Sequence, residues 1–290
     1  MIPGAFEYHA PSSLDEAVKL LGQHPDDAKV LAGGHSLLPM MKLRFAEPTH
    51  LVDLGRIAEL KGIREEKGVI RIGAMTTENE LIASELLRQK CPLIPEAARV
   101  VADPQVRNCG TIGGDIAHGD PGNDHPAIML ALEASFVLRG PKKKERVVPA
   151  DGFFLGTYQT QLEPNEILVE IRVPVAPPHT GQAYCKLKRK TGDFATAAAA
   201  VQLQLDGDVC KKAVIALTNL GPAPLKANDA AAALAGHAID DARIEQAAQK
   251  AMAICDPAED LRGDREYKIH MAGEMTRRAI RQALERARGR

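Results

Sequence analysis

The sequence contains no tryptophan, and aromatic residues make up only 3% of its 290 residues. Proteins that bind nucleic acids stack bases on aromatic side chains and place excess positive charge against phosphates. Here the formal net charge is -1. The composition therefore argues against nucleic-acid binding, and we expect no nucleic-acid partner.

Long apolar segments are also missing. The longest runs, AIMLALEASFVL and ATAAAAV, are too short to span a bilayer, and Glu133 interrupts the first. The opening MIPGAFEYHA has neither the basic region nor the apolar region of a secretory signal. We therefore expect a cytoplasmic protein.

Cysteine is scarce and widely spaced. The five cysteines are Cys91, Cys109, Cys185, Cys210 and Cys255, and no two are closer than 18 positions. Zinc sites and iron–sulfur clusters require cysteines in closely spaced groups such as CxxC. An odd number of cysteines without an export signal is typical of reduced thiols. The chain is therefore not expected to hold a metal or a cluster through cysteine.

What the sequence does contain is an alternation of helix and strand patterns. In residues 1–60, Ser13 and Glu16 have the spacing of a capping box before a helix with one apolar face. The segment AKVLA predicts a strand that runs into a glycine pair, and HLVDL predicts the next strand. We assign residues 1–60 to a first α/β subdomain.

Residues 61–176 have the pattern of a second α/β subdomain. GVIRIGA alternates like a strand, and Thr77 and Glu80 form another candidate capping box before LIASELLRQ. Helices are predicted near residues 92–101 and 124–132. Strands are predicted at SFVLR and at ILVEIRVPV, which would close the unit.

The segment VPVAPPHTGQ is rich in proline and glycine and predicts a linker. The pattern of predicted helices and strands changes after it. Residues 177–290 contain two strand patterns joined at an Asp206-Gly207 turn, followed by two or three alanine-rich helices. The predicted fold class is therefore α+β, with two α/β subdomains and a C-terminal antiparallel sheet with helices.

Two glycine-rich loops are the strongest local signals. LAGGHSLLPMMKLR begins at Leu31, and NCGTIGGDIAHGDPGNDHP begins at Asn108. Glycine lets the backbone approach a ligand closely, and successive N–H groups with a nearby Ser36 or Thr111 hydroxyl can hold phosphate. Neither loop has the spacing of a Rossmann fingerprint or a P-loop. From the residues alone, tight turns and a pyrophosphate site remain two open interpretations.

The two loops, extended to AGGHSLLPMMKLR and ADPQVRNCGTIGGDIAHGDPGNDHPA, and the segment KLKRKTGDFATA resemble the FAD-binding subunit of the molybdenum hydroxylases. The resemblance covers essentially the whole chain. Within this family it is strongest to the medium subunit of aerobic carbon monoxide dehydrogenases. It implies two subdomains of the vanillyl-alcohol-oxidase-like type that clasp FAD, followed by the C-terminal domain of these flavoproteins.

The resemblance also implies a set of cofactor-binding residues and no catalytic or metal-ligating residue. The set consists of Ala32, Gly33, Gly34, His35 and Ser36 along the pyrophosphate, Thr111, Ile112, Gly113, Gly114 and Asp115 in the second loop, and Asp124, Leu162, Lys186 and Phe194. Asp124 matches the acidic residue that binds ribityl hydroxyls, and Lys186 is a cation near the flavin. Phe194 matches an aromatic residue against the isoalloxazine ring.

A cluster of histidines and acidic residues in the second loop allows a metal-site interpretation. It comprises Asp115, His118, Asp120, Asp124 and His125. The resemblance accounts for Asp124 without a metal, so no metal site is predicted there. His35 is interpreted as a polar wall of the site because flavin, rather than the protein, supplies the redox chemistry.

The function implied by the resemblance is electron transfer within a larger enzyme. In such enzymes a large subunit oxidises substrate at a molybdenum cofactor, and a small subunit passes electrons through two [2Fe–2S] clusters to FAD on the medium subunit. An external acceptor reoxidises the flavin. The implied assembly is a dimer of heterotrimers, and the resemblance allows peripheral association with membrane electron acceptors at the inner face of the membrane.

Three alternatives remain at this point. In the first, the chain is the flavin subunit of another molybdenum hydroxylase, which oxidises aldehydes or N-heterocycles. Alternatively, it is a stand-alone FAD-dependent reductase of the same fold, such as an enolpyruvyl-sugar reductase. The third alternative is a non-enzymatic nucleotide-binding or assembly protein.

Overall fold

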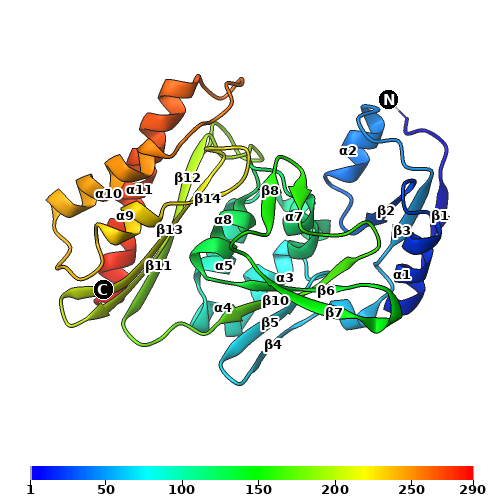
Figure 1. Cartoon of the computed structure of the whole chain (residues 1–290), viewed down its shortest axis with the longest axis horizontal. Coiled ribbons are helices and arrows are strands. Elements are labelled where there is room, and N and C mark those ends of the chain that lie inside the picture. The colour runs from blue at the N-terminus through cyan, green and yellow to red at the C-terminus, as the bar shows by residue number, and fades with distance from the viewer. Residues whose placement is uncertain (1, 290) are drawn as a thin grey trace.

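The computed structural model describes residues 2–289. Its three larger sheets follow one another in sequence order along the long axis of the molecule (Figure 1). The N-terminal unit is a parallel sheet with the order β1-β3-β2. Its elements are β1 (Glu7–His9), α1 (Leu14–Gln23), β2 (Ala28–Leu31), α2 (Leu37–Lys42) and β3 (His50–Asp53). Parallel neighbours require crossover connections, and α1 and α2 provide them.

Helix α1 begins where the sequence predicts it. The Ser13 hydroxyl accepts a hydrogen bond from the Glu16 N–H, whereas the Glu16 carboxylate bonds to the N–H of Ser12 rather than that of Ser13. The apolar face of the helix, which includes Leu14 and Leu21, is buried in a small core. Only half of the predicted capping box is therefore formed, and packing fixes the rest of the helix.

The middle unit is a five-stranded antiparallel sheet with the order β4-β5-β10-β6-β7. Its strands are β4 (Ile63–Glu66), β5 (Val69–Gly73), β6 (Ser135–Arg139), β7 (Glu145–Pro149) and β10 (Ile167–Pro174). The 3-10 turns Ala58–Leu60 and Pro141–Lys143 and the hairpin β8 (Phe154–Gly156) and β9 (Gln159–Thr160) lie in the connections. The strand predicted to close the unit, β10, instead lies in the centre of the sheet.

Helices α3 (Glu78–Ala83), α4 (Glu85–Lys90), α5 (Leu93–Val100), α7 (Ile112–His118) and α8 (Asp124–Ala131) bury side chains in the core on one face of this sheet (Figure 1). Helix α6 (Pro104–Cys109) has no buried residue and packs beside α3. Thr77 forms both bonds of the predicted capping box with Glu80. The single helix expected from LIASELLRQ is divided at Ser84, which ends α3 and whose hydroxyl caps α4. Sequence periodicity does not detect this break because both helices bury leucines.

The two faces of the middle sheet pack against different neighbours. On β6, Phe136 and Leu138 lie in the main core under the helices, whereas Val137 lies in the core of the N-terminal unit. Successive side chains of a strand point to opposite faces, so one strand serves both cores. The N-terminal unit is thereby seated against the middle sheet.

The C-terminal unit is an antiparallel sheet with the order β11-β12-β13-β14, covered by helices. Its elements are β11 (Thr180–Leu187), β12 (Ala197–Asp206), β13 (Val209–Thr218), β14 (Leu225–Lys226), α9 (Asn228–Ala232), α10 (Asp241–Ala253) and α11 (Arg265–Ala287). The turn predicted at Asp206-Gly207 joins β12 to β13. Of the segment predicted as a linker, residues 175–179 connect two strands as expected, and its two ends are strand, because Pro174 ends β10 and Thr180 begins β11. The predicted domain boundaries at residues 60 and 176 lie between strands of different sheets and stay proposals.

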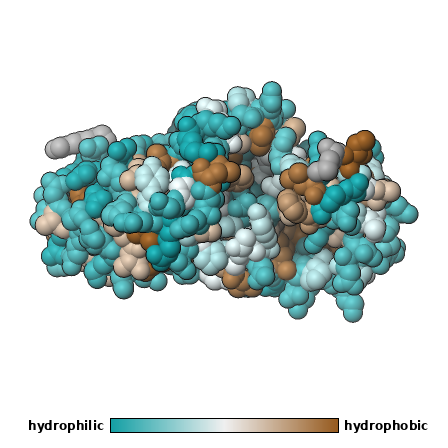
Figure 2. Space-filling view, turned by 90° about the horizontal axis from the view of Figure 1, so that it is seen from above, coloured by the Kyte–Doolittle hydropathy of each residue, from teal (hydrophilic) through white to brown (hydrophobic). Residues whose placement is uncertain are grey.

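None of the helices within residues 2–289 is long and apolar enough to cross a membrane. Seen from above, the surface is hollowed between the N-terminal unit at the right and the middle of the molecule, and apolar residues gather around the hollow (Figure 2). Leu43 and Phe45, which follow α2, are exposed large apolar residues of the N-terminal unit.

Candidate functional site

The first glycine loop leaves β2 at the carboxyl end of the parallel sheet. Gly34 has a φ of +74°, the left-handed conformation that favours glycine. Among the hydrogen bonds of the described residues, the backbone N–H groups of residues 33–37 donate to no protein acceptor. His35 and Ser36 are exposed. A run of free N–H groups after a parallel strand is suited to bind an anion such as a pyrophosphate.

The second glycine loop lies directly against the first. A Cβ atom on Gly33 would be 2.3 Å from the carbonyl oxygen of Cys109 and 2.8 Å from the Cα of Gly110. A Cβ on Gly114 would lie 3.4 Å from the Cβ of Ala32. The N-terminal and middle units therefore meet at the two loops, and only glycine permits this separation at position 33. The structure thus brings together the two loops that the sequence singled out.

The second loop uses its own N–H groups within the protein. The N–H groups of Ile112 and Gly113 donate to the carbonyls of Thr76 and Ala74, at 3.0 and 2.9 Å. The N–H groups of Gly114 and Asp115 donate to the hydroxyl and the carbonyl of Thr111, at 3.1 and 3.0 Å. A Cβ on Gly113 would be 2.5 Å from that of Ala74, and Ile112 is fully buried. The backbone from Ile112 to Asp115 therefore offers a ligand no free N–H donor.

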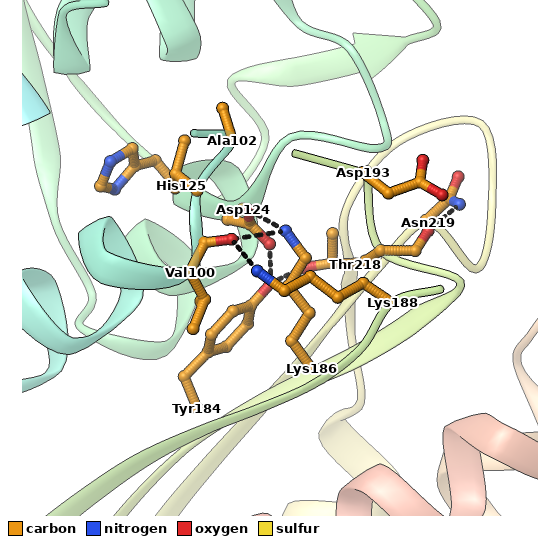
Figure 3. A network of polar contacts seen from close by, with 12 residues as sticks. Val100, Ala102, Asp124, His125, Tyr184, Lys186, Lys188, Asp193, Thr218 and Asn219 are labelled. Carbon is orange, nitrogen blue, oxygen red and sulfur yellow. Dashed lines mark hydrogen bonds and ion pairs between the residues drawn. The ribbon is translucent and has the colours of Figure 1, made fainter. Parts of the chain in front are cut away.

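Asp124 lies at the centre of a polar network between the middle and C-terminal units (Figure 3). It is the first residue of α8 and is 4% exposed. Its Oδ2 accepts from the Lys186 Nζ at 2.7 Å, and its Oδ1 accepts from the Tyr184 hydroxyl. Lys186 and Lys188 both donate to the Val100 carbonyl, at 3.2 and 3.1 Å. Each carboxylate oxygen keeps a second lone pair, with which it can accept a hydroxyl of a ligand.

Tyr184 is the residue of this network that the sequence analysis missed. Burial, followed by the neighbouring Asp124 charge, raises the pKa of the Tyr184 hydroxyl well above its ordinary value, so it stays a hydrogen-bond donor. Tyr184 and Lys186 are two positions apart on β11 and share one face of the strand. That spacing is the signal that places Tyr184 beside Lys186. Strand β11 stops at Leu187, so Lys188 lies just after the strand.

Behind Asp124 lies a buried acid–base cluster. The Nε2 atom of His125 contacts the Glu78 carboxylate oxygens at 2.9 and 3.0 Å. Burial opposes the charge of His125, but the Glu78 carboxylate outweighs it and raises the pKa of His125 to about 9. Burial raises the pKa of Asp115 to about 8. Two atoms of this cluster, the Asp115 Oδ2 and the His125 Nδ1, have no hydrogen-bond partner among the described residues.

Phe194 and Leu162 occupy different surroundings. Phe194 is 44% exposed, its ring carbon lies 3.2 Å from where a Cβ of Gly122 would stand, and the Arg262 guanidinium lies 5.5 Å from the ring centre. An exposed aromatic face close to the α8 N-terminus is suited to pack against a flat ring system. Leu162 packs against the core of the middle unit, and its predicted contact with the cofactor stays a prediction.

Taken together, the residues fit an FAD molecule. The free N–H groups of residues 33–37 suit the pyrophosphate, the Asp124 carboxylate suits ribityl hydroxyls, and the Phe194 ring suits the isoalloxazine. A Cβ at position 33 would meet the second loop at 2.3 Å, so the contact between the two loops itself requires glycine there. The individual contacts to FAD stay predictions.

Comparison with known proteins gives the same assignment over the whole chain. The family described as FAD binding domain in molybdopterin dehydrogenase matches residues 4–176, and the CO dehydrogenase flavoprotein C-terminal domain matches residues 182–283. The chain is 60% identical to the carbon monoxide dehydrogenase medium chain of Hydrogenophaga pseudoflava over 99% of both chains. It is 51% identical to that of Afipia carboxidovorans, over 99% of this chain and 100% of the relative.

Solved structures agree with the sequence comparison. The carbon monoxide dehydrogenase from Hydrogenophaga pseudoflava superposes with a TM-score of 0.97 at 62% identity over 99% of both chains. Quinoline 2-oxidoreductase from Pseudomonas putida 86 gives 0.93 at 34% identity, again over 99% of both. The predicted fold class and family are confirmed: the chain belongs to the FAD-binding subunits of the molybdopterin-dependent dehydrogenases, a family of multi-subunit oxidoreductases.

Proposed function

We propose that this chain is the FAD-carrying subunit of an aerobic carbon monoxide dehydrogenase and passes electrons from a partner's [2Fe–2S] clusters to an external acceptor. The observation that carries the proposal is the full-length identity of 60% and 51% to two carbon monoxide dehydrogenase medium chains. The quinoline-oxidising relative is only 34% identical over the same length. The sequence is therefore nearer to the enzymes that act on carbon monoxide.

When bound, FAD supplies the redox chemistry, and this chain supplies its placement and electrostatic surroundings. The free N–H groups of residues 33–37 would hold the pyrophosphate, and the contact of Gly33 with Cys109 keeps the second loop at the right separation. Asp124 would orient the ribityl chain. The Lys186 ammonium, held by Asp124 at 2.7 Å, fixes a positive charge beside it. No residue of the chain is required to exchange a proton with substrate.

The proposed function requires two further subunits. The relatives are called medium chains, which implies a large and a small subunit. All five cysteines are free. We place the molybdenum cofactor on the large subunit and both [2Fe–2S] clusters on the small one. The proposed assembly is a dimer of heterotrimers in the cytoplasm, with peripheral association to membrane electron acceptors.

The test is to purify the native complex through this chain and to analyse its cofactors and its activity. We expect FAD, [2Fe–2S] clusters and molybdenum in a complex with two further polypeptides, and reduction of an artificial dye that depends on carbon monoxide. Flavin on a single polypeptide that turns over its own substrate would replace the proposal with the stand-alone reductase. A complete complex that oxidises an aldehyde or an N-heterocycle but not carbon monoxide would identify another molybdenum hydroxylase.

A further inference from the structure

A cluster of histidines lies on the N-terminal sheet, away from the glycine loops. Strands β1 and β3 are parallel neighbours, and Glu7 is paired in register with His50. Glu7 and His9 are two positions apart on β1 and share one face. His50 begins β3, whereas the glycine loop follows the last residue of the parallel strand β2. His50 therefore lies at the amino end of the parallel strands, and the glycine loop lies at their carboxyl end.

The three side chains bring three potential ligand atoms together. The His9 Nε2 lies 3.1 Å from the His50 Nδ1, and the Glu7 Oε2 lies 3.6 Å from the His50 Nδ1 and 3.9 Å from the His9 Nε2. A point equidistant from three atoms so spaced is about 2.1 Å from each, which is the Zn–N and Zn–O bond length. The triangle therefore has the size of a zinc coordination shell without any rearrangement of the backbone.

A third histidine holds the cluster in place. His24, the residue that ends α1, stacks on His50 with ring centres 3.7 Å apart and planes 20° from parallel. His9 stacks on the other rings at longer range, 5.4 Å from His50 and 6.4 Å from His24. A stacked neighbour fixes the ring plane of a ligand, as outer partners of metal-binding histidines do.

The cluster is also accessible. His50 and His9 are 16% and 26% exposed at their side chains, and Glu7 is 74% exposed. The two imidazoles are therefore largely covered by the protein, while the carboxylate side is open to water. Two imidazoles, one carboxylate and an open position form the donor set of zinc sites that retain a water ligand.

We propose that Glu7, His9 and His50 bind a divalent transition-metal ion, with Zn²⁺ as the ion that the geometry favours. Imidazole donors prefer zinc, copper and nickel over the hard cations magnesium and calcium. The ion ties β1, a three-residue strand at the edge of the sheet, to the central strand β3. The site is distinct from the FAD site and stabilises the N-terminal segment.

The test is Zn²⁺ binding to the full chain after treatment with a chelator, measured by equilibrium dialysis and elemental analysis. We expect one tightly bound ion per chain, and a rise in the melting temperature when Zn²⁺ is returned. Glu7→Gln keeps the size of an exposed side chain and removes its charge. We expect it, and His50→Gln, to weaken Zn²⁺ binding at least about tenfold while FAD content is unchanged.

The matched control is His270→Gln. The Nε2 atom of His270 lies 3.8 Å from the Glu266 carboxylate on an exposed helix face, which offers one imidazole and one carboxylate only. Zn²⁺ binding should be unaffected by this change. The proposal is overturned if Zn²⁺ does not bind the unaltered chain, if Glu7→Gln and His50→Gln bind as tightly as it does, or if His270→Gln weakens binding equally.

Discussion

The two glycine loops share a sequence pattern but differ in how the fold uses them. In the first loop, residues 33–37 keep their N–H groups free, and His35 and Ser36 are exposed. In the second, every N–H from Ile112 to Asp115 is bonded within the protein, and the backbone packs against Ala74. A glycine pair beside a hydroxyl residue can therefore indicate either a backbone that is available to a ligand or a packing surface. The two are distinguished by whether each backbone N–H group has an acceptor within the protein.

A large effect on both FAD binding and stability is expected at Gly33, where the predicted binding surface and the packing between the loops coincide. In Gly33→Val the new Cβ would stand 2.3 Å from the Cys109 carbonyl oxygen, so the loops must separate. Overpacking costs about 1–3 kcal/mol of folding free energy. We expect FAD affinity to fall at least about tenfold because the free N–H groups of residues 33–37 are displaced. FAD content by absorbance and the melting temperature would be measured. Gly22→Val is the control, because no atom lies within 4 Å of a Cβ there; normal FAD content in Gly33→Val would refute the loop assignment.

An effect of similar size is expected at Asp124, because its carboxylate holds a buried cation and is also predicted to face the ribityl chain. Removing its carboxylate in Asp124→Ala leaves Lys186, whose side chain is 3% exposed, without its partner. Breaking such a buried pair costs about 3–5 kcal/mol of folding free energy, and the loss of one charge-assisted hydrogen bond to a ribityl hydroxyl weakens FAD by about 1.5–3 kcal/mol. Urea unfolding and FAD titration separate the two effects. Adding Lys186→Met should restore much of the stability but not the FAD affinity; recovery of both would remove Asp124 from the cofactor site.

Gly113→Ala tests the packing side of the comparison. Its Cβ would meet that of Ala74 at 2.5 Å. We expect a loss of about 1–3 kcal/mol in unfolding free energy by overpacking, with a smaller effect on FAD affinity than Gly33→Val. Gly22→Ala in α1 should be neutral or stabilising by comparison. If Gly113→Ala lowered FAD affinity as strongly as Gly33→Val without loss of stability, the distinction between the two loops would be wrong.

The smallest expected effect is a pH dependence from the buried end of the second loop. Burial raises the pKa of Asp115 to about 8, so the folded chain keeps a proton that the unfolded chain loses above about pH 4. The folded state therefore binds more protons in this window, and its stability falls as pH rises until about pH 8. Between about pH 5 and 6, His125 is protonated in the folded state because its pKa is raised to about 9, and it is largely protonated in the unfolded state because the ordinary histidine pKa is about 6.5. There Asp115→Asn should remove a slope of about 1 kcal/mol per pH unit from urea unfolding; identical slopes would show that Asp115 is ionised.

Much of this arrangement is predictable from local sequence, and the rest depends on contacts between distant segments. The glycine loops, the Thr77 capping box and the Asp206-Gly207 turn follow from residue types at short spacing. The role of the second loop does not follow in this way, because the acceptors of its Ile112 and Gly113 N–H groups are the carbonyls of Thr76 and Ala74, after β5.

The same limit explains the missed elements. Ser84 divides a helix because its hydroxyl caps the next one, although the apolar pattern continues through it. Strand β11 begins at Thr180, inside the predicted linker, because β12 pairs with it over its whole length. Tyr184 joins Asp124 only once this strand is placed against α8. Local residue patterns predict helices and strands, whereas contacts with distant segments determine where these helices and strands end and which residues they contact.

The ion pair between Asp124 and Lys186 spans two segments that match separate families, residues 4–176 and 182–283. The chain is therefore not two interchangeable modules. A chimaera that takes its C-terminal segment from a relative must bring a cation and a hydroxyl to the positions of Lys186 and Tyr184, or it will carry a buried, uncompensated acid where its two segments meet. Compatibility between the two segments therefore depends on this one polar network.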